Sequence, residues 1–139
     1  MSAKILLIDD EEMLRNLYKE FMEIKQCTVR AAKSCEDALN HLQDFVPDLI
    51  ICDIKMPGTD GIETLKLLKN HNRYRKFPVV MLTAVNEVES IKQCLAFGAL
   101  GYVVKIGKPD QIYYQLQLFL KAIMADKFAK SNTAPLRVV

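Results

Sequence analysis

The segment Ile5-Leu-Leu-Ile-Asp-Asp-Glu11 places four apolar residues directly before three acidic ones. The apolar part shows no polar alternation, which is typical of a strand buried on both faces, as in a parallel sheet covered by helices. Four more short apolar runs follow along the chain, at residues 27–32, 49–52, 79–82 and 101–104. The run at 27–32 is the weakest, so we expect it at an edge of the sheet.

Segments with helical periodicity separate or follow these runs. Apolar residues recur every three or four positions across residues 14–22 and 112–123, which indicates one-sided helices. Gly98 fits a left-handed C-cap after the fourth helix, and Pro109 fits the first turn of the fifth. Three shorter helices are predicted from N-cap residues followed by an acid three positions later. These pairs are Ser34 with Asp37, Asp60 with Glu63, and Asn86 with Glu89.

Strand and helix therefore alternate five times, which predicts an α/β fold, (βα)5, with a parallel sheet and right-handed crossovers. A length of 139 residues fits one domain. We expect the domain to comprise residues 1–127. The apolar period then fades and Ser, Asn, Thr and Pro appear, so residues 128–139 are predicted to be a tail or the start of a linker.

Composition excludes several classes of protein. Half of the residues are hydrophobic, 26% are charged and the formal charge is +2, which disfavours a disordered chain and a dedicated nucleic-acid binder. No stretch approaches the ~20 apolar residues of a membrane helix, and acids at positions 9 and 10 interrupt the place of a signal peptide. The four cysteines form no C-x-x-C pair and are expected to be reduced core thiols. We therefore expect a cytoplasmic protein without direct nucleic-acid or membrane contact.

Polar side chains end four of the five apolar runs. Asp9 and Asp10 end the first, Asp53 the third, Thr83 the fourth and Lys105 the fifth. The carboxyl ends of parallel strands form the ligand-binding edge of an open α/β sheet, so these side chains should meet there. Three crowded carboxylates repel one another unless a cation is present. Oxygen ligands without His or Cys favour Mg²⁺ over zinc.

Taken with their spacing, these residues give the chain its resemblance to a response-regulator receiver domain, the phosphoacceptor module of two-component signalling. The resemblance extends from residue 4 to about residue 125 and implies a flavodoxin-like strand order 2-1-3-4-5, as in chemotaxis regulators. It is carried by segment 5–11 and by three further stretches. These are Asp53-Ile-Lys-Met-Pro-Gly-Thr-Asp-Gly61, Val79-Val-Met-Leu-Thr-Ala84 and Gly101-Tyr-Val-Val-Lys105.

The resemblance assigns roles to individual residues. Asp53 becomes the nucleophile that accepts a phosphoryl group from a sensor histidine kinase, and Lys105 neutralises charge on the transferred oxygens. Asp10 and Asp53 would ligate Mg²⁺ directly, Asp9 would help through water, and the backbone carbonyl of Lys55 would supply another oxygen. The product would be an aspartyl phosphate.

The resemblance also implies a switch. The Thr83 hydroxyl would turn to bind the phosphoryl group, and the ring of Tyr102 would turn inward to fill the vacated space. This motion would reshape the surface of the fourth helix, fifth strand and fifth helix. That surface commonly docks partners or a second copy in the family, so the expected partners are an output protein or domain and, through the same surface, a homodimer.

The chain departs from the family after Lys105, where Ile106 replaces the usual proline. A cis bond before a non-proline residue costs ~3 to 4 kcal/mol. We therefore expect a trans peptide, with Gly107 absorbing the rerouting and Pro109 opening the helix slightly late. Lys108 precedes Pro109 and is a second candidate for the catalytic lysine. We favour Lys105 because it directly ends the strand.

Other interpretations of these residues compete with this one. Asp9 and Asp10 could cap a helix, and Thr83 and Tyr102 could be ordinary strand residues. A Mg²⁺-dependent phosphohydrolase typically needs a second acid two residues after the nucleophile, where this chain has Lys55.

A flavodoxin would need a Ser-, Thr- and Gly-rich phosphate loop in place of the acids at 9–12. The intact acidic set gives no support to a phosphorylation-independent interaction domain. Val85 occupies a position that tunes hydrolysis in the family, and its apolar side chain predicts a phosphate lifetime that is not especially short.

Overall fold

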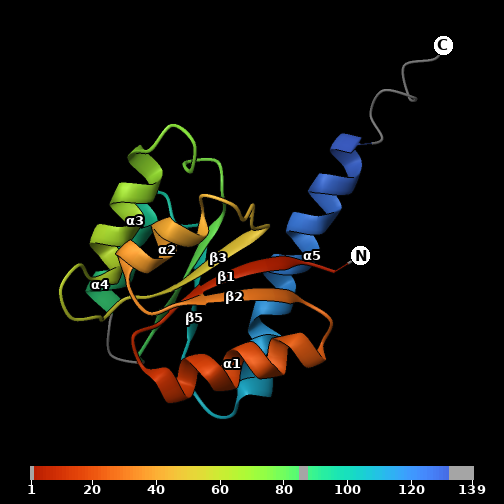
Figure 1. Ribbon diagram of the computed structural model, residues 1–139, viewed down its shortest axis with the longest axis horizontal. Coiled ribbons are helices and arrows are strands. Elements are labelled where there is room, and N and C mark those ends of the chain that lie inside the picture. Colours follow the sequence, from red (N-terminus) through yellow and green to blue (C-terminus); the bar gives the residue numbers. More distant parts are fainter. Residues whose placement is uncertain (1, 85–87, 132–139) are drawn as a thin grey trace.

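The computed structural model describes residues 2–84 and 88–131, and within them it forms five strands and five helices in strict alternation (Figure 1). The strands are β1 (Lys4–Ile8), β2 (Thr28–Ala32), β3 (Leu49–Asp53), β4 (Val79–Thr83) and β5 (Gly101–Val104). The helices are α1 (Glu12–Ile24), α2 (Cys35–His41), α3 (Gly61–Asn70), α4 (Val88–Ala96) and α5 (Pro109–Ser131). The predicted α/β class is confirmed.

All neighbouring strands in the sheet are parallel, and their order is β2-β1-β3-β4-β5. The expected order 2-1-3-4-5 and the edge position of β2 are therefore confirmed. The chain passes from β1 outward to β2 and then returns to place β3 on the other side of β1. This reversal separates the loops that leave β1 and β3, and it opens a crevice at their carboxyl ends.

The sheet is covered on both faces, which explains why its strands lack polar alternation. Helices α1 and α5 cover one face, and α2, α3 and α4 cover the other (Figure 1). Successive strand residues point to opposite faces, so Leu6 and Ile50 pack toward α2 and α3, while Leu7 and Ile51 pack toward α1 and α5.

Helix-capping side chains lie where the sequence predicts them. The Ser34 Oγ accepts a hydrogen bond from the Asp37 amide at 3.1 Å, and the Asp60 Oδ1 accepts one from the Glu63 amide at 2.9 Å. Gly98 has a φ of +103°, the left-handed conformation that ends α4. The cap predicted at Asn86 lies outside the described residues.

The connection from β5 to α5 follows the expected course. No peptide bond among the described residues is cis, Gly107 has a φ of +79°, and Pro109 is the first residue of α5. Helix α5 continues to Ser131, beyond the domain end expected at residue 127. The Lys127 ammonium anchors this last part through a 2.9 Å ion pair with Asp48. That residues 128–139 act as a tail or linker stays a prediction.

None of the helices that the structure describes combines the length and the apolar character needed to cross a membrane.

Gly61, the first residue of α3, packs directly against the backbone after β3. A Cβ atom there would overlap the Asp53 carbonyl oxygen and the Ile54 Cα. We expect Gly61→Ala to lower the free energy of unfolding by about 3 kcal/mol, because backbone cannot yield as a side chain does. Urea denaturation measures this loss.

Gly58→Ala is the matched control, because a Cβ at Gly58 meets no atom within 4 Å and only its φ of +74° is unfavourable. Its cost should be about 1 kcal/mol. A loss at Gly61 no greater than that at Gly58 would contradict the packing argument.

Candidate functional site

The carboxyl ends of β1, β3 and β5 surround an open cavity of about 380 Å³. The loop after β1 contributes two acidic residues, β3 and its loop contribute the central carboxylate, and β5 contributes a cation. The lining residues are Asp10, Glu11, Asp53, Ile54, Lys55, Ala84 and Lys105. Four of the predicted site residues, Asp10, Asp53, Lys55 and Lys105, therefore lie around one cavity.

Three carboxylates crowd at this end of the sheet. One oxygen from each of Asp9, Asp10 and Asp53 lies within 4.8 Å of the others. Asp9 is fully buried and Asp53 is 7% exposed, whereas Asp10 is exposed. Asp10 and Asp53 face the cavity while Asp9 lies beneath it, so the predicted group of carboxylates does form.

The hydrogen bonds of Asp9 leave one carboxylate oxygen without a donor. Its amide donates to the Ala32 carbonyl at 3.0 Å, and its own carbonyl accepts from the Arg15 guanidinium at 2.8 Å. The Oδ1 atom accepts from the Glu11 amide at 2.9 Å. The buried Oδ2 atom has no hydrogen-bond partner among the described residues and lies 3.7 Å from the Lys105 ammonium.

A buried, unpaired carboxylate oxygen is costly unless a cation approaches it. This orphaned oxygen and the two neighbouring carboxylates are hard oxygen donors, with no His or Cys in the cluster. Such a donor set suits Mg²⁺, which takes one or two carboxylates and keeps several waters. The residues present therefore fit the ion that the sequence predicts.

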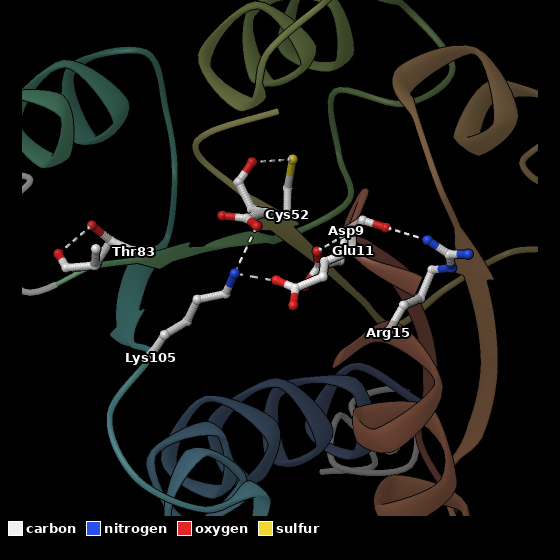
Figure 2. Close-up of polar contacts among 8 residues, drawn as sticks. Asp9, Glu11, Arg15, Cys52, Thr83 and Lys105 are labelled. Carbon is white, nitrogen blue, oxygen red and sulfur yellow. Dashed lines mark hydrogen bonds and ion pairs between the residues drawn. The ribbon is translucent and has the colours of Figure 1, made fainter. Parts of the chain in front are cut away.

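Lys105 is the cation that pairs with the carboxylates Asp53 and Asp9. Its ammonium lies 2.7 Å from the Asp53 Oδ2, and Figure 2 shows the side chain extending from the end of β5 toward Asp9 as well. Lys108 instead lies exposed in the following loop, where its amide donates to the Gln111 side chain at 2.8 Å. Of the two candidate lysines, Lys105 is the one that contacts Asp53.

Electrostatics at the site leave a demand for positive charge. Burial raises the pKa of the Asp53 carboxyl, Lys105 opposes that increase, and the charges of Asp9 and Asp10 add to it, so the pKa lies above its ordinary value. Burial lowers the pKa of the Lys105 ammonium, but the hydrogen bond and charge of Asp53 outweigh this effect and raise it. One ammonium thus faces more than one negative charge.

The two predicted switch residues, Thr83 and Tyr102, are not among the residues that line the cavity. Thr83 is buried at the end of β4, and its hydroxyl donates to the neighbouring Ala84 carbonyl at 3.0 Å (Figure 2). Tyr102 is 44% exposed, consistent with an outward ring. Val85 lies outside the described residues.

Two contacts at the site were missed by sequence analysis. Arg15 holds the Asp9 carbonyl, and the Cys52 thiol donates to the Asp53 carbonyl at 3.4 Å. Both side chains bind backbone carbonyl groups, so these contacts cannot be predicted from residue type alone. The position of Arg15 one turn into the helix that follows two acids is the only hint that the sequence offers.

This fold, with acids and a lysine at the carboxyl ends of its strands, defines the class of receiver modules. The sequence profile of the response regulator receiver domain matches residues 5–117. The chain therefore belongs to that family, and this membership supports a phosphoacceptor signalling role.

The alignments with individual relatives cover different fractions of the two chains compared. It is 32% identical to the chemotaxis protein CheY of Halobacterium salinarum, over 76% of this chain and 86% of CheY. It is also 32% identical to the regulatory protein AtoC of Escherichia coli, over 85% of this chain but only 25% of AtoC. The chemotaxis response regulator CheY4 of Vibrio cholerae superposes with a TM-score of 0.76 at 30% identity, covering 84% of this chain and 98% of CheY4. The chain thus spans a quarter of the length of AtoC.

The ion pair predicts how Asp53 responds to loss of the lysine. Lys105→Met should raise the pKa of Asp53 further, because it removes the charge that lowers this pKa while burial and the neighbouring acids remain. A pH titration of the Asp53 carboxyl carbon by NMR, without divalent cations, measures the change. Lys108→Met is the control and should leave the titration unmoved; a larger shift in that variant would show that the wrong lysine has been assigned.

Proposed function

We propose that this chain is a phosphorylation-controlled signalling switch in which Asp53 accepts a phosphoryl group from a sensor histidine kinase. One observation carries the proposal: Asp53 lines an open cavity with its carboxylate beside those of Asp9 and Asp10 and 2.7 Å from the Lys105 ammonium. A nucleophile, a cation and a set of metal ligands are thereby gathered around one reacting group.

The transfer follows from the placement of these residues. An Asp53 carboxylate oxygen attacks phosphorus in line, an oxygen–phosphorus bond forms, and the phosphorus–nitrogen bond of the donor phosphohistidine breaks, which releases the imidazole. Lys105 neutralises charge on the transferred oxygens. Asp10, Asp53 and the Lys55 carbonyl would hold Mg²⁺, with Asp9 acting through water. When bound, the ion supplies charge neutralisation for the phosphoryl oxygens.

The switch is driven by the charge of the product. A phosphoryl group carries roughly −1.5 to −2 near neutral pH and recruits hydrogen-bond donors. The Thr83 hydroxyl would leave the Ala84 carbonyl, to which it now donates, and bind the phosphoryl group. The outward Tyr102 ring would then turn into the space that Thr83 leaves.

The affected surface is the α4-β5-α5 face, formed by the outer sides of α4, β5 and α5. Exposed apolar side chains on these elements support a docking role; they include Leu95, Tyr102 and Leu118. The proposed partners are an output protein or domain and a second copy of the chain. The match to one quarter of the regulatory protein AtoC supports an output domain. The proposal places the switch in the cytoplasm, without direct contact with nucleic acid or membrane.

The family consists of switches rather than turnover enzymes, and the proposal keeps that distinction. A phosphohydrolase of the kind considered above would use an acid two residues after the nucleophile, but Lys55 stands there. Continuous release of phosphate from a donor over many turnovers would favour that alternative.

Incubation with Mg²⁺ and acetyl phosphate, followed by intact mass measurement, tests the assignment of Asp53. The unaltered chain should gain one phosphoryl group, and Asp53→Ala should gain none, because Asp53 is the one acid of the three-carboxylate cluster that both lines the cavity and pairs with Lys105. Chelation of the metal should also prevent the gain. The control Asp44→Ala removes an exposed acid that pairs with Arg30 and should leave the gain intact. A phosphoryl group on the Asp53→Ala chain would contradict the proposal.

The role of the threonine can be separated from phosphorylation itself. Thr83→Ala should still accept a phosphoryl mimic such as beryllofluoride at Asp53, but the NMR signals of the Tyr102 ring should shift much less than in the unaltered chain. Thr83→Ser keeps the hydroxyl and should restore most of the shift. An equally large shift without any hydroxyl at position 83 would rule out this coupling.

A further inference from the structure

Strand β5 pairs with β4 in continuous parallel register, from Val80 opposite Gly101 to Thr83 opposite Val104. The Lys105 amide continues this ladder by donating to the Thr83 carbonyl at 2.8 Å. An edge strand leaves the amide and carbonyl groups of alternate residues directed away from its neighbour, and in β5 those of Val104 are directed in this way.

A side chain from α5 binds both of these backbone groups of Val104. The Val104 amide donates to the Gln115 Oε1 at 3.2 Å, and the Gln115 Nε2 donates to the Val104 carbonyl at 3.1 Å. Because β5 is an edge strand, no further strand can satisfy these groups. The Gln115 carboxamide therefore pairs with the edge of β5 as a neighbouring strand would.

The residue after Val104 is Lys105, whose side chain extends from the end of β5 (Figure 2) and whose ammonium lies 2.7 Å from the Asp53 carboxylate. The loop beyond it gives weaker support, because Ile106 is 52% exposed and Gly107 has a φ of +79°. On the strand side, the pair of bonds from Gln115 holds the backbone from which Lys105 extends.

We propose that Gln115 is a positioning residue for Lys105, fixing the backbone of Val104 so that the ammonium stays beside the Asp53 carboxylate. The proposal rests on the proposed function, since it assigns Gln115 an effect on phosphoryl transfer. Gln115 contacts neither the carboxylates nor the cavity lining and acts only through the lysine. If Gln115 only covered the edge of the sheet, it would stabilise the fold, and the effect of its removal on phosphorylation would not depend on Lys105.

A double-mutant cycle separates these two roles. The rate of phosphorylation by acetyl phosphate and Mg²⁺ is measured for the unaltered chain, Gln115→Ala, Lys105→Ala and the double variant. Gln115→Ala should slow phosphorylation about tenfold, because a small displacement of a catalytic group is costly. In the Lys105→Ala background the same change should alter the rate less than about twofold, since residues that act through one another are not additive.

Gln117→Ala is the matched control, because it removes the same side chain from the same helix on the side that faces α1, where Gln117 lines a hollow with Lys25 and Tyr113. It should leave the rate unchanged. If the unaltered chain takes up no phosphoryl group, the proposed function itself fails. Two results would overturn the positioning role alone in a chain that does take up a phosphoryl group. One is an unchanged rate in Gln115→Ala, and the other is an equal slowing by Gln115→Ala with and without Lys105.

A measurement on the unaltered chain covers the case in which Gln115→Ala does not fold. Hydrogen exchange at the Val104 amide should be slow, because this group is bonded to Gln115 although it lies at the sheet edge. Exchange as fast as that of an exposed loop amide would overturn the proposal without any variant. Thermal melts followed by circular dichroism identify a variant that fails to fold.

Discussion

The site depends on how the repulsion among three carboxylates at the end of one sheet is offset. Asp9 is fully buried, Asp53 nearly so, and both have an oxygen within 4.8 Å of one from Asp10. Lys105 supplies one positive charge, 2.7 Å from Asp53 and 3.7 Å from Asp9. Burial is the largest cause that raises the pKa of Asp53; Lys105 opposes it, and the charges of Asp9 and Asp10 add to it. The crowded carboxylates and the buried Asp9 oxygen, which has no hydrogen-bond donor among the described residues, suit the site to a divalent cation.

The fold produces this crowding through its strand order. Because β1 and β3 are neighbours while the chain between them visits the edge at β2, the acids that follow β1 and end β3 meet at the switch point. Backbone contacts then hold them in place. Arg15 and the Glu11 amide fix both ends of Asp9, and Gly61 lets α3 start against the Asp53 carbonyl. The packing of the main chain thus maintains a charge arrangement that would otherwise separate.

The sequence predicts the parts of this site that depend on topology and misses those that depend on side-chain reach. Asp10, Asp53 and Lys105 end apolar runs, and parallel strands must gather their carboxyl ends, so pattern alone brings these residues together. Arg15 and Gln115 bind backbone atoms six and eleven residues away in the chain, and a hydropathy pattern does not indicate hydrogen bonds from side chain to backbone. The extension of α5 to Ser131 is of the same kind, because the ion pair of Lys127 with Asp48 forms only after folding. Composition in that region indicated only the loss of apolar periodicity.

The loop after Lys105, where the chain departs from the family, and side chains of α5 together determine the position of the lysine. A loop that continues through Ile106 and Gly107 has little rigidity of its own, yet the ammonium must remain beside Asp53 in the presence of competing charges. Side chains of α5 supply the missing order: Gln115 binds the last residue of β5, and Gln111 binds the loop amide of Lys108. Since α5 also belongs to the face proposed to dock partners, a partner bound on its outer side would contact the same helix that holds the strand end before the lysine.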